Sequence, residues 1–308
     1  MYSPSQLWRG LKSPNLFLRE ANRQYHRRLN KREYNTDGVD VIDEDWDNLL
    51  ILDACRYDMF EDGSTLPGRL ESRYSRGSTT VEFLRANFSD REMEDTVYVT
   101  ANPQLYRNYE DVNPNFHAVE NIWLESGWDD EFQTVLPETT TEYALEAAEK
   151  YPDKRLIVHY IQPHYPFITD ATSFDKGYLD NPDSDTRDFW GRKMESELDV
   201  SKGSIWHAYT GNLLRSLPHV SRLMDALAGK TVVTADHGNM VGERAFPFPI
   251  REWGHPRGIY TEELVKVPWL VHENGPRKEI TADGSEQGME DVDDDVVSDR
   301  LEQLGYVE

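Results

Sequence analysis

The sequence predicts an α/β fold with a mostly parallel sheet. Two short apolar runs, 46–52 and 231–234, lack the polar alternation of half-exposed strands, which is typical of parallel strands buried on both faces. Each run leads directly into an acidic residue, Asp53 and Asp236. Further apolar runs at 95–100, 155–161 and 267–271 and helical patterns at 138–150 and 205–227 complete the prediction, the second helix interrupted at Pro218.

Asp236 and His237 fall where open α/β sheets bind their ligands, at the carboxyl end of a strand. An adjacent carboxylate and imidazole can reach one divalent cation, and Gly238 lets the backbone turn close to it. The alternative interpretation is a polar turn for Asp236 and a helix N-cap for Asp53. Two strands that end in acids at the same sheet edge favour a shared metal.

Small hydroxyl residues precede a helical run that starts near Thr80. Thr79 with Glu82 three positions later has the spacing of a capping box. A hydroxyl at a helix N-terminus also lies in a positive field, where it can approach a metal and lose its proton more easily. Spacing alone leaves both interpretations open.

Two histidines stand on tight backbone beyond strand ends. His164 lies between Pro163 and Pro166, and His255 lies between Gly254 and Pro256. Prolines limit the conformational freedom of such loops, so both imidazoles are candidates for a site. His159, inside a strand, is expected to be structural.

Two longer segments have weaker patterns. The polar and aromatic segment 108–137 is expected to be a lid or insertion over the sheet edge. The charged segment 170–200 has no strand signal and is expected to form a mobile loop near the site.

The chain has 308 residues and a formal charge of −24, with 57 acidic and 33 basic residues, of which 10 are lysine. A Lys-poor, carboxylate-rich surface suits concentrated salt, so a halophilic, archaeal source is expected and nucleic acid is excluded as a partner. The single cysteine, Cys55, excludes an internal disulfide. With no signal peptide or apolar run of transmembrane length, a soluble cytoplasmic protein is expected.

The charge is unevenly distributed. Residues 1–33 hold eight basic and two acidic side chains, a balance of +6 that leaves −30 on the rest. This basic arm, with Trp8, Leu11, Phe17 and Leu18, either contacts an anionic membrane peripherally or straps the acidic body of its own molecule. The second interpretation is slightly favoured because few of its apolar residues keep helical spacing.

The expected organisation has three parts. A basic arm at 1–40 precedes a catalytic domain at 41–275. Residues 276–308 are an acidic linker followed by a short helix near 296–304.

Several short pieces, in this order, resemble the alkaline phosphatase/sulfatase superfamily, and the acidic composition resembles that of a haloarchaeal, sulfatase-like member. The likeness covers roughly 46–271 and a closing Leu304-Gly305-Tyr306. The matching pieces are Leu49-Leu-Ile-Leu-Asp53-Ala-Cys-Arg56-Tyr-Asp58, Gly77-Ser-Thr79-Thr, Pro163-His164-Tyr-Pro166, Ala235-Asp236-His237-Gly238 with Gly242-Glu243, and Gly254-His255 before Val267-Pro268.

The resemblance implies a three-layer α/β/α sandwich and a divalent cation (Mn, Ca, Mg or Zn) held by Asp53, Asp236 and His237. Thr79 is implied as both ligand and nucleophile, with Thr80 and Ser78 as alternatives. His164 and His255 are implied to contact non-bridging or leaving-group oxygens of an ester.

Two departures from the family narrow these expectations. Neither Cys55, followed by Arg56-Tyr-Asp-Met59, nor Thr79 fits the Cys/Ser-x-Pro-x-Arg motif of formylglycine sulfatases. No Asp stands four residues before a His, as a second metal site of the two-zinc type requires, so one metal is expected.

The leading functional hypothesis is a metal-dependent hydrolase of sulfate or phosphate esters that acts through a covalent Thr ester. The first alternative is a phosphotransferase of envelope lipids or glycans, held at the membrane by the basic arm. The second is a degenerate, non-catalytic domain that keeps the metal and binds a glycan or protein. The expected substrate is a small-molecule, glycan or lipid ester.

Overall fold

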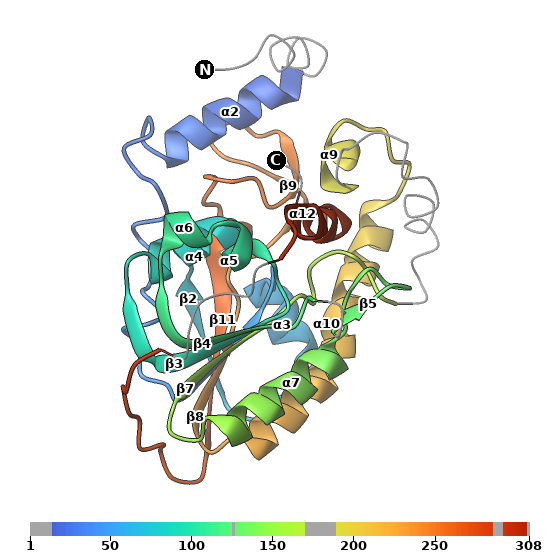
Figure 1. Cartoon of the computed structure of the whole chain (residues 1–308). Helices are drawn as coiled ribbons and strands as arrows, with labels where there is room; N and C mark the ends of the chain where they lie inside the picture. Colours follow the sequence, from blue (N-terminus) through green and yellow to red (C-terminus); the bar gives the residue numbers. More distant parts are fainter. Residues whose placement is uncertain (1–13, 125–126, 170–188, 286–291, 307–308) are drawn as a thin grey trace.

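The computed structural model has a central sheet of seven strands in the order β2-β11-β8-β1-β7-β3-β4 (Figure 1). The structure describes residues 14–124, 127–169, 189–285 and 292–306. The strands are β1 (Asn48–Leu52), β2 (Arg69–Tyr74), β3 (Glu92–Thr100), β4 (Asn115–Asn121), β7 (Arg155–Tyr160), β8 (Gly229–Thr234) and β11 (Lys266–Asn274).

The sheet is mostly parallel, as predicted. β8, β1, β7, β3 and β4 pair in parallel, and β11 runs antiparallel to both β8 and β2. All five residues of β1 are buried, because the strand lies near the middle of the sheet with a helical layer on each face.

Alternate residues of β1 belong to two different cores. Leu50 and Leu52 pack in the larger cluster, and Leu49 and Ile51 pack in the smaller one. The larger core lies under α3 (Tyr57–Gly63), α7 (Pro137–Lys150) and α10 (Lys202–Ala226). The smaller lies under α4 (Thr80–Phe88), α5 (Gln104–Arg107) and α6 (Tyr109–Val112). Figure 1 shows these two groups of helices on opposite faces of the sheet, which confirms the three-layer α/β/α prediction.

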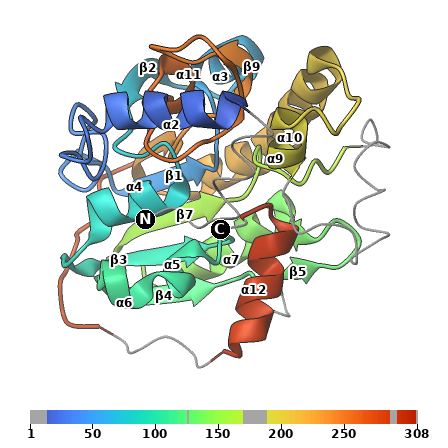
Figure 2. The same ribbon diagram turned by 90° about the horizontal axis from the view of Figure 1, so that it is seen from above.

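The remaining elements lie around the sheet (Figures 1 and 2). They are α2 (Pro14–His26), α9 (Phe189–Met194), α11 (Glu262–Val265), α12 (Asp294–Gln303), and two short hairpins, β5 (Trp128–Asp129) with β6 (Thr134–Val135) and β9 (Met240–Arg244) with β10 (Arg251–Gly254). Seen from above in Figure 2, α2 and α12 lie over different parts of the sheet edge at which the parallel strands end.

Three local expectations were wrong. Part of the predicted lid, β4, is an edge strand of the central sheet paired with β3. α10 continues through Pro218, because Leu213, Leu217 and Val220 on either side of it are buried and their packing outweighs one lost backbone bond. β2 was not predicted, because it is a charged edge strand with no buried residue.

Two segments of the sequence analysis lie partly or wholly outside the described residues. These are residues 170–188 of the predicted loop 170–200 and the first 13 residues of the basic arm. Among the helices that the structure describes, none combines the length and apolar composition needed to cross a bilayer.

Candidate active site

Four neighbouring strands bring polar side chains to one edge of the sheet. Asp53 directly follows β1, Asp236 follows β8 by two residues, and Asn102 follows β3 by two residues. His159 lies in β7 opposite Ile51 of β1. The side chains of Asp53, Asp236 and His159 are fully buried. Strand order therefore gathers residues that are far apart in the sequence.

Each buried carboxylate has one oxygen held by hydrogen bonds and one oxygen free. Asp236 Oδ1 accepts the backbone N–H groups of Ala54 at 3.0 Å and His237 at 2.8 Å. Asp53 Oδ2 accepts Asn102 Nδ2 at 2.7 Å and the Tyr306 hydroxyl at 2.6 Å. Asp53 Oδ1 and Asp236 Oδ2 have no hydrogen-bond partner in the described structure. Two buried carboxylates with free oxygens are costly unless a cation lies between them.

Two imidazoles present ring nitrogens to the two acids. His237 Nδ1 lies 2.8 Å from the Gly238 carbonyl, which can only accept, so this nitrogen carries the proton. Its Nε2 is therefore bare and lies 3.4 Å from Asp236 Oδ2 and 3.7 Å from Asp53 Oδ1. His159 contacts Tyr98 Oη through Nδ1 at 2.7 Å, which leaves its Nε2 facing both acids at 3.8 Å.

These residues form a site that could hold a metal. Ligand atoms of Asp53, His159 and Asp236 all lie within 4.8 Å of one another. Carboxylate oxygens and imidazole nitrogens are donors that Zn²⁺ and Mn²⁺ accept, and the carboxylates also suit Mg²⁺. The free atoms described above are the ones that such a cation would bind. His159, expected to be structural, therefore belongs to the same cluster as the predicted ligands.

The electrostatics of the metal-free cluster favour one retained proton. Burial and the neighbouring Asp236 carboxylate raise the pKa of Asp53 well above its ordinary value. Burial also acts to raise the pKa of Asp236, but the imidazoles of His237 and His159 and the Ala54 N–H outweigh it and lower that pKa. Burial lowers the pKa of His159 to about 4, so this imidazole is neutral at pH 7 and available as a ligand.

The structure brings Thr80, and not Thr79, to this cluster. Thr79 caps α4: its hydroxyl accepts the Glu82 N–H at 3.3 Å, as the capping-box interpretation proposed. The Thr80 hydroxyl is buried and lies 3.4 Å from His237 Nε2 and 3.3 Å from the Tyr306 hydroxyl, and it acts to lower the pKa of both Asp53 and Asp236. Successive residues at a helix start point in different directions, which explains the displacement by one position.

Ser78 has a structural role beside the site. Its hydroxyl donates to Glu82 Oε2 at 2.9 Å and accepts the Gly258 N–H at 2.9 Å. It thereby ties the start of α4 to the loop that follows His255.

His164 and His255 form a pair next to His237. His164 Nδ1 donates to the Tyr165 carbonyl at 2.6 Å, so its Nε2 accepts a hydrogen bond from His255 Nε2 at 2.9 Å. The His255 and His237 rings are 4.7 Å apart between centroids. Burial lowers the pKa of His164 to about 4 and that of His255 well below its ordinary value, which keeps both rings neutral.

Close backbone approach explains the small residues of the site. A Cβ on Gly238 would overlap the Glu263 carbonyl oxygen and lie 3.1 Å from Arg56 Cγ. Ala54, whose N–H holds Asp236, has a φ of +59°, in the left-handed region that non-glycine residues seldom adopt.

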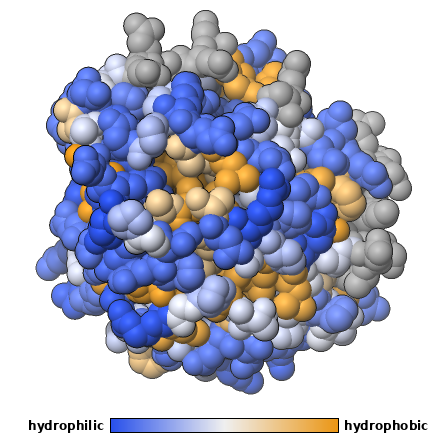
Figure 3. All heavy atoms as spheres, turned by 90° about the horizontal axis from the view of Figure 1, so that it is seen from below, coloured by the Kyte–Doolittle hydropathy of each residue, from blue (hydrophilic) through white to orange (hydrophobic). Residues whose placement is uncertain are grey.

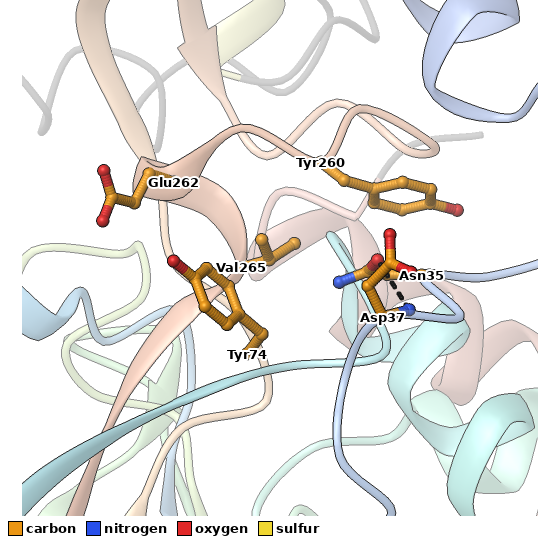
Figure 4. A pocket seen from close by; sticks show the side chains of 6 residues that line it. All are labelled: Asn35, Asp37, Tyr74, Tyr260, Glu262 and Val265. Carbon is orange, nitrogen blue, oxygen red and sulfur yellow. Dashed lines mark hydrogen bonds between the residues drawn. The ribbon is translucent and has the colours of Figure 1, made fainter.

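A separate cavity of about 360 Å³ is lined by Asn35, Asp37, Tyr74, Tyr260, Glu262 and Val265 (Figure 4). None of the clustered acids or imidazoles lines it. Its two carboxylates are paired, Asp37 with Arg32 and Glu262 with Lys266. It therefore offers no chemistry that competes with the buried cluster.

Solved structures with a similar fold include phosphoethanolamine transferases and sulfatases. The C-terminal periplasmic domain of phosphoethanolamine transferase EptC from Campylobacter jejuni has a TM-score of 0.47 and 14% identity, and the alignment covers 73% of this chain and 78% of that one. The soluble domain of lipooligosaccharide phosphoethanolamine transferase A from Neisseria meningitidis has a TM-score of 0.45, 11% identity and coverages of 73% and 75%. A putative sulfatase from Bacteroides fragilis has a TM-score of 0.29, 17% identity and coverages of 46% and 31%.

These neighbours are of the kind that the order of motifs resembles. No family model matches the sequence, and no curated protein matches it. At such low identities the likeness concerns the fold, so the chemistry of the site has to follow from its own residues.

Three contributors to the site were not predicted. Asn102 and Tyr306 hold Asp53, and Tyr98 holds His159. Asn102 stands two residues after the predicted strand 95–100. Asp53 and Asp236 were predicted from the same kind of position, just beyond a strand end. Tyr306 had a signal only in the closing Leu304-Gly305-Tyr306, and Tyr98 had none.

Proposed function

We propose that this protein is a metal-dependent enzyme that hydrolyses or transfers phosphate or sulfate esters through Thr80. The observation that carries the proposal is the geometry of the two buried acids: each has one oxygen fixed and one free, and both free oxygens face the bare Nε2 of His237, which lies next to the buried Thr80 hydroxyl.

Asp53, Asp236 and His237 would hold one divalent cation, with Thr80 as the adjoining hydroxyl and His159 as a further imidazole within reach. When bound, such a cation lowers the pKa of a neighbouring hydroxyl and stabilises negative charge on the oxygens of the ester. The fixed oxygens of the two acids keep the free oxygens in place, so little reorganisation is needed on binding.

Thr80 is the proposed nucleophile. Its Oγ forms a bond to phosphorus or sulfur while the bond to the departing alkoxide breaks, and the proton that the hydroxyl loses is balanced by the proton that the alkoxide takes up. The covalent Thr ester is then resolved by water in hydrolysis or by an acceptor hydroxyl in transfer. Both outcomes use the same residues.

The histidine pair is proposed to hold the oxygens of the ester. The ring N–H that His255 donates to His164 in this structure is a neutral donor beside the nucleophile. Neutral donors suit this position because they hold a dianionic group without forming a permanent ion pair with it. Thr80 in the cluster argues against the alternative of a non-catalytic binding domain.

The test measures turnover of nitrophenyl phosphate, bis-nitrophenyl phosphate and nitrophenyl sulfate in high salt with Mn²⁺, Zn²⁺, Mg²⁺ and Ca²⁺. Thr80→Ala is expected to lower kcat by about a thousandfold or more while metal still binds. Thr79→Ala is the matched control: it removes a helix cap worth about 1 kcal/mol and should keep turnover within a few-fold.

Equal losses in the two variants would remove Thr80 from the role of nucleophile. Failure of all three esters in a metal-bound wild type would favour an acceptor-dependent transferase or a binding domain. The ester that turns over fastest would distinguish phosphate from sulfate.

A further inference from the structure

Helix α2 is attached to the protein by its polar face. Arg19 forms a two-pronged ion pair with Glu252 of β10, whose side chain is fully buried. The Asn22 side chain bonds to both the N–H and the carbonyl of Phe248, and His26 Nε2 lies 2.9 Å from the Phe246 carbonyl. Positions 19, 22 and 26 lie on one side of the helix, and this side faces the body of the molecule.

The large apolar side chains that α2 exposes point outward beside this anchored side. The described residues include nine exposed large hydrophobic side chains, and six of them lie on α2, on the turn that follows it, and on the loop beneath it. We call these six residues the apolar face: Phe17, Leu18, Tyr25, Leu29, Phe246 and Phe248, which are 37% to 76% exposed. Tyr25 and Phe246 pack edge to face at 5.5 Å, which joins helix and loop in one surface.

This arrangement is the reverse of that in an ordinary surface helix. An amphipathic helix of a globular protein normally buries its apolar side and exposes its polar side. Here the buried contacts are ion pairs and hydrogen bonds, and the aromatic and aliphatic side chains face out. Exposed apolar side chains gathered on one helix and its neighbouring loop are typical of a binding face.

The surroundings of the apolar face are basic in an otherwise acidic molecule. Residues 14–33 contain six arginines and lysines and two glutamates, whereas the whole chain has a charge of −24. Arg28 and Lys31 are exposed on either side of the exposed Leu29. Figure 3 views the molecule from below, from the side opposite to α2 in Figure 1, and shows hydrophobic areas near the middle of that face surrounded by hydrophilic residues.

We propose that the apolar face binds an anionic lipid surface, with its aromatic and aliphatic side chains in the interface and the basic residues on lipid headgroups. Apolar side chains flanked by arginine and lysine are the composition that interfacial helices use. An acidic protein partner would satisfy the charges but not six exposed hydrophobic side chains. The body, with its negative charge, would be held away from the lipid, so binding through this face also orients the molecule.

Helix α2 and the turn after it contact the segment 252–258, which carries His255 of the candidate site. Glu252, the partner of Arg19, precedes His255 by three residues. Gly258, three residues after His255, packs against the side chains of Arg23 and Arg27, because a Cβ on it would lie 2.6 Å from Arg27 Cδ and 3.1 Å from Arg23 Cγ. This step rests on the proposed function: because the lipid-binding face lies close to the candidate site, we assign esters carried by lipids as the class of substrate.

The test is sedimentation of the full chain with vesicles of phosphatidylglycerol and, separately, of phosphatidylcholine. The double variant Phe17→Glu/Tyr25→Glu is expected to lower binding to phosphatidylglycerol by about tenfold or more. The control is Leu214→Glu, an equally exposed hydrophobic residue of α10 that lies outside the apolar face, and it should bind like the wild type. Leu29→Glu, on the turn after α2, serves as a second variant if the double variant melts below the wild type.

Unchanged binding of both the double variant and Leu29→Glu would overturn the proposal, as would equal binding to the two kinds of vesicle. Light scattering provides another decisive result: a wild-type dimer that the double variant dissociates would assign the face to a second copy of the chain. Turnover of a soluble nitrophenyl ester should be unchanged in the double variant, and only a lipid-borne ester should be turned over more slowly. A wild type that turns over no soluble ester would count against the proposed function, but the result of the vesicle-binding experiment would still stand.

Discussion

The Tyr306 hydroxyl donates to Asp53 Oδ2 at 2.6 Å, and its ring stacks on that of His164 with centroids 4.8 Å apart. Tyr306 also contacts Asn102 Nδ2 at 2.8 Å. It follows α12, whose Val297 and Leu301 are buried against the rest of the protein. The end of the chain thus fixes the one oxygen of Asp53 that the cation would not use, and supports one ring of the histidine pair.

Tyr306→Phe is expected to weaken metal binding. The phenylalanine keeps the stacking on His164 but leaves Asp53 held by Asn102 alone, and loss of a hydrogen bond that orients a ligand typically lowers metal affinity by about tenfold to a hundredfold. Titration of the metal-free protein with Mn²⁺ or Zn²⁺, followed by calorimetry, measures the change.

Tyr106→Phe is the matched control, because the Tyr106 hydroxyl accepts the Val292 N–H at 2.8 Å and anchors the same C-terminal segment without entering the site. If both variants bind metal equally well, Tyr306 does not position Asp53.

Metal binding should release protons and become tighter as pH rises. In the metal-free protein, burial and the Asp236 charge raise the pKa of Asp53 well above its ordinary value of 3.8, so the native state keeps a proton that the unfolded chain loses. The metal-free protein therefore loses stability as pH rises above about 4 toward that raised pKa, and a cation that displaces the proton restores it.

Calorimetry in two buffers of different ionisation enthalpy counts the protons released. A binding enthalpy that does not depend on the buffer would show that Asp53 is already ionised before the metal arrives.

Acid should destabilise the fold through its buried imidazoles. Burial lowers the pKa of His159 and of His164 from 6.5 to about 4, so the native state keeps these rings neutral where the unfolded chain protonates them. Their contribution is present above pH 6.5 and is lost as pH falls toward 4, on the order of 3 kcal/mol for each ring.

Thermal unfolding of the metal-free protein between pH 7 and pH 4 measures this loss. His159→Gln should flatten the dependence. Because the raised pKa of Asp53 acts in the opposite direction between pH 4 and pH 7, the decisive comparison is between variant and wild type: an equal pH dependence of the two would contradict the assignment of neutral buried rings.

The sequence predicts the framework of the site better than its details. Asp53 and Asp236 could be found because parallel strands end at one edge, so an acid after each of two buried runs falls in the same place. The hydroxyl that joins the cluster could not be placed to a single residue, because Thr79 and Thr80 both stand at a helix start and only the backbone geometry of the N-cap separates them. The strand β4 was missed because its polar edge residues resemble a loop.

Other parts of the site depend on long-range contacts that no local sequence pattern reveals. His159 has the appearance of a core residue of β7, and only the registers of β1 with β7 and with β8 put its Nε2 near both acids. Tyr306 reaches Asp53 across 253 positions of sequence. The sequence also could not show which side of α2 faces the protein, because a segment with a polar and an apolar side can dock by either one.

Gly238→Ala is expected to destabilise the protein and weaken its metal site together. The added Cβ would overlap the Glu263 carbonyl oxygen and press on Arg56 Cγ at 3.1 Å, and the Gly238 N–H bonds to the Leu264 carbonyl at 2.7 Å, so the backbone has little room to yield. Overpacking of this kind costs about 1–3 kcal/mol, and any shift of the turn displaces His237, whose ring is held by the Gly238 carbonyl.

Gly203→Ala is the control, since its Cβ would meet only Ser201 Oγ at 3.8 Å in the first turn of α10, and a helical alanine should leave stability equal or higher. Urea unfolding measures the stability of both variants, and metal titration measures their affinity for the cation. Equal stability and equal metal affinity of the Gly238→Ala and Gly203→Ala proteins would show that the turn after His237 tolerates a side chain.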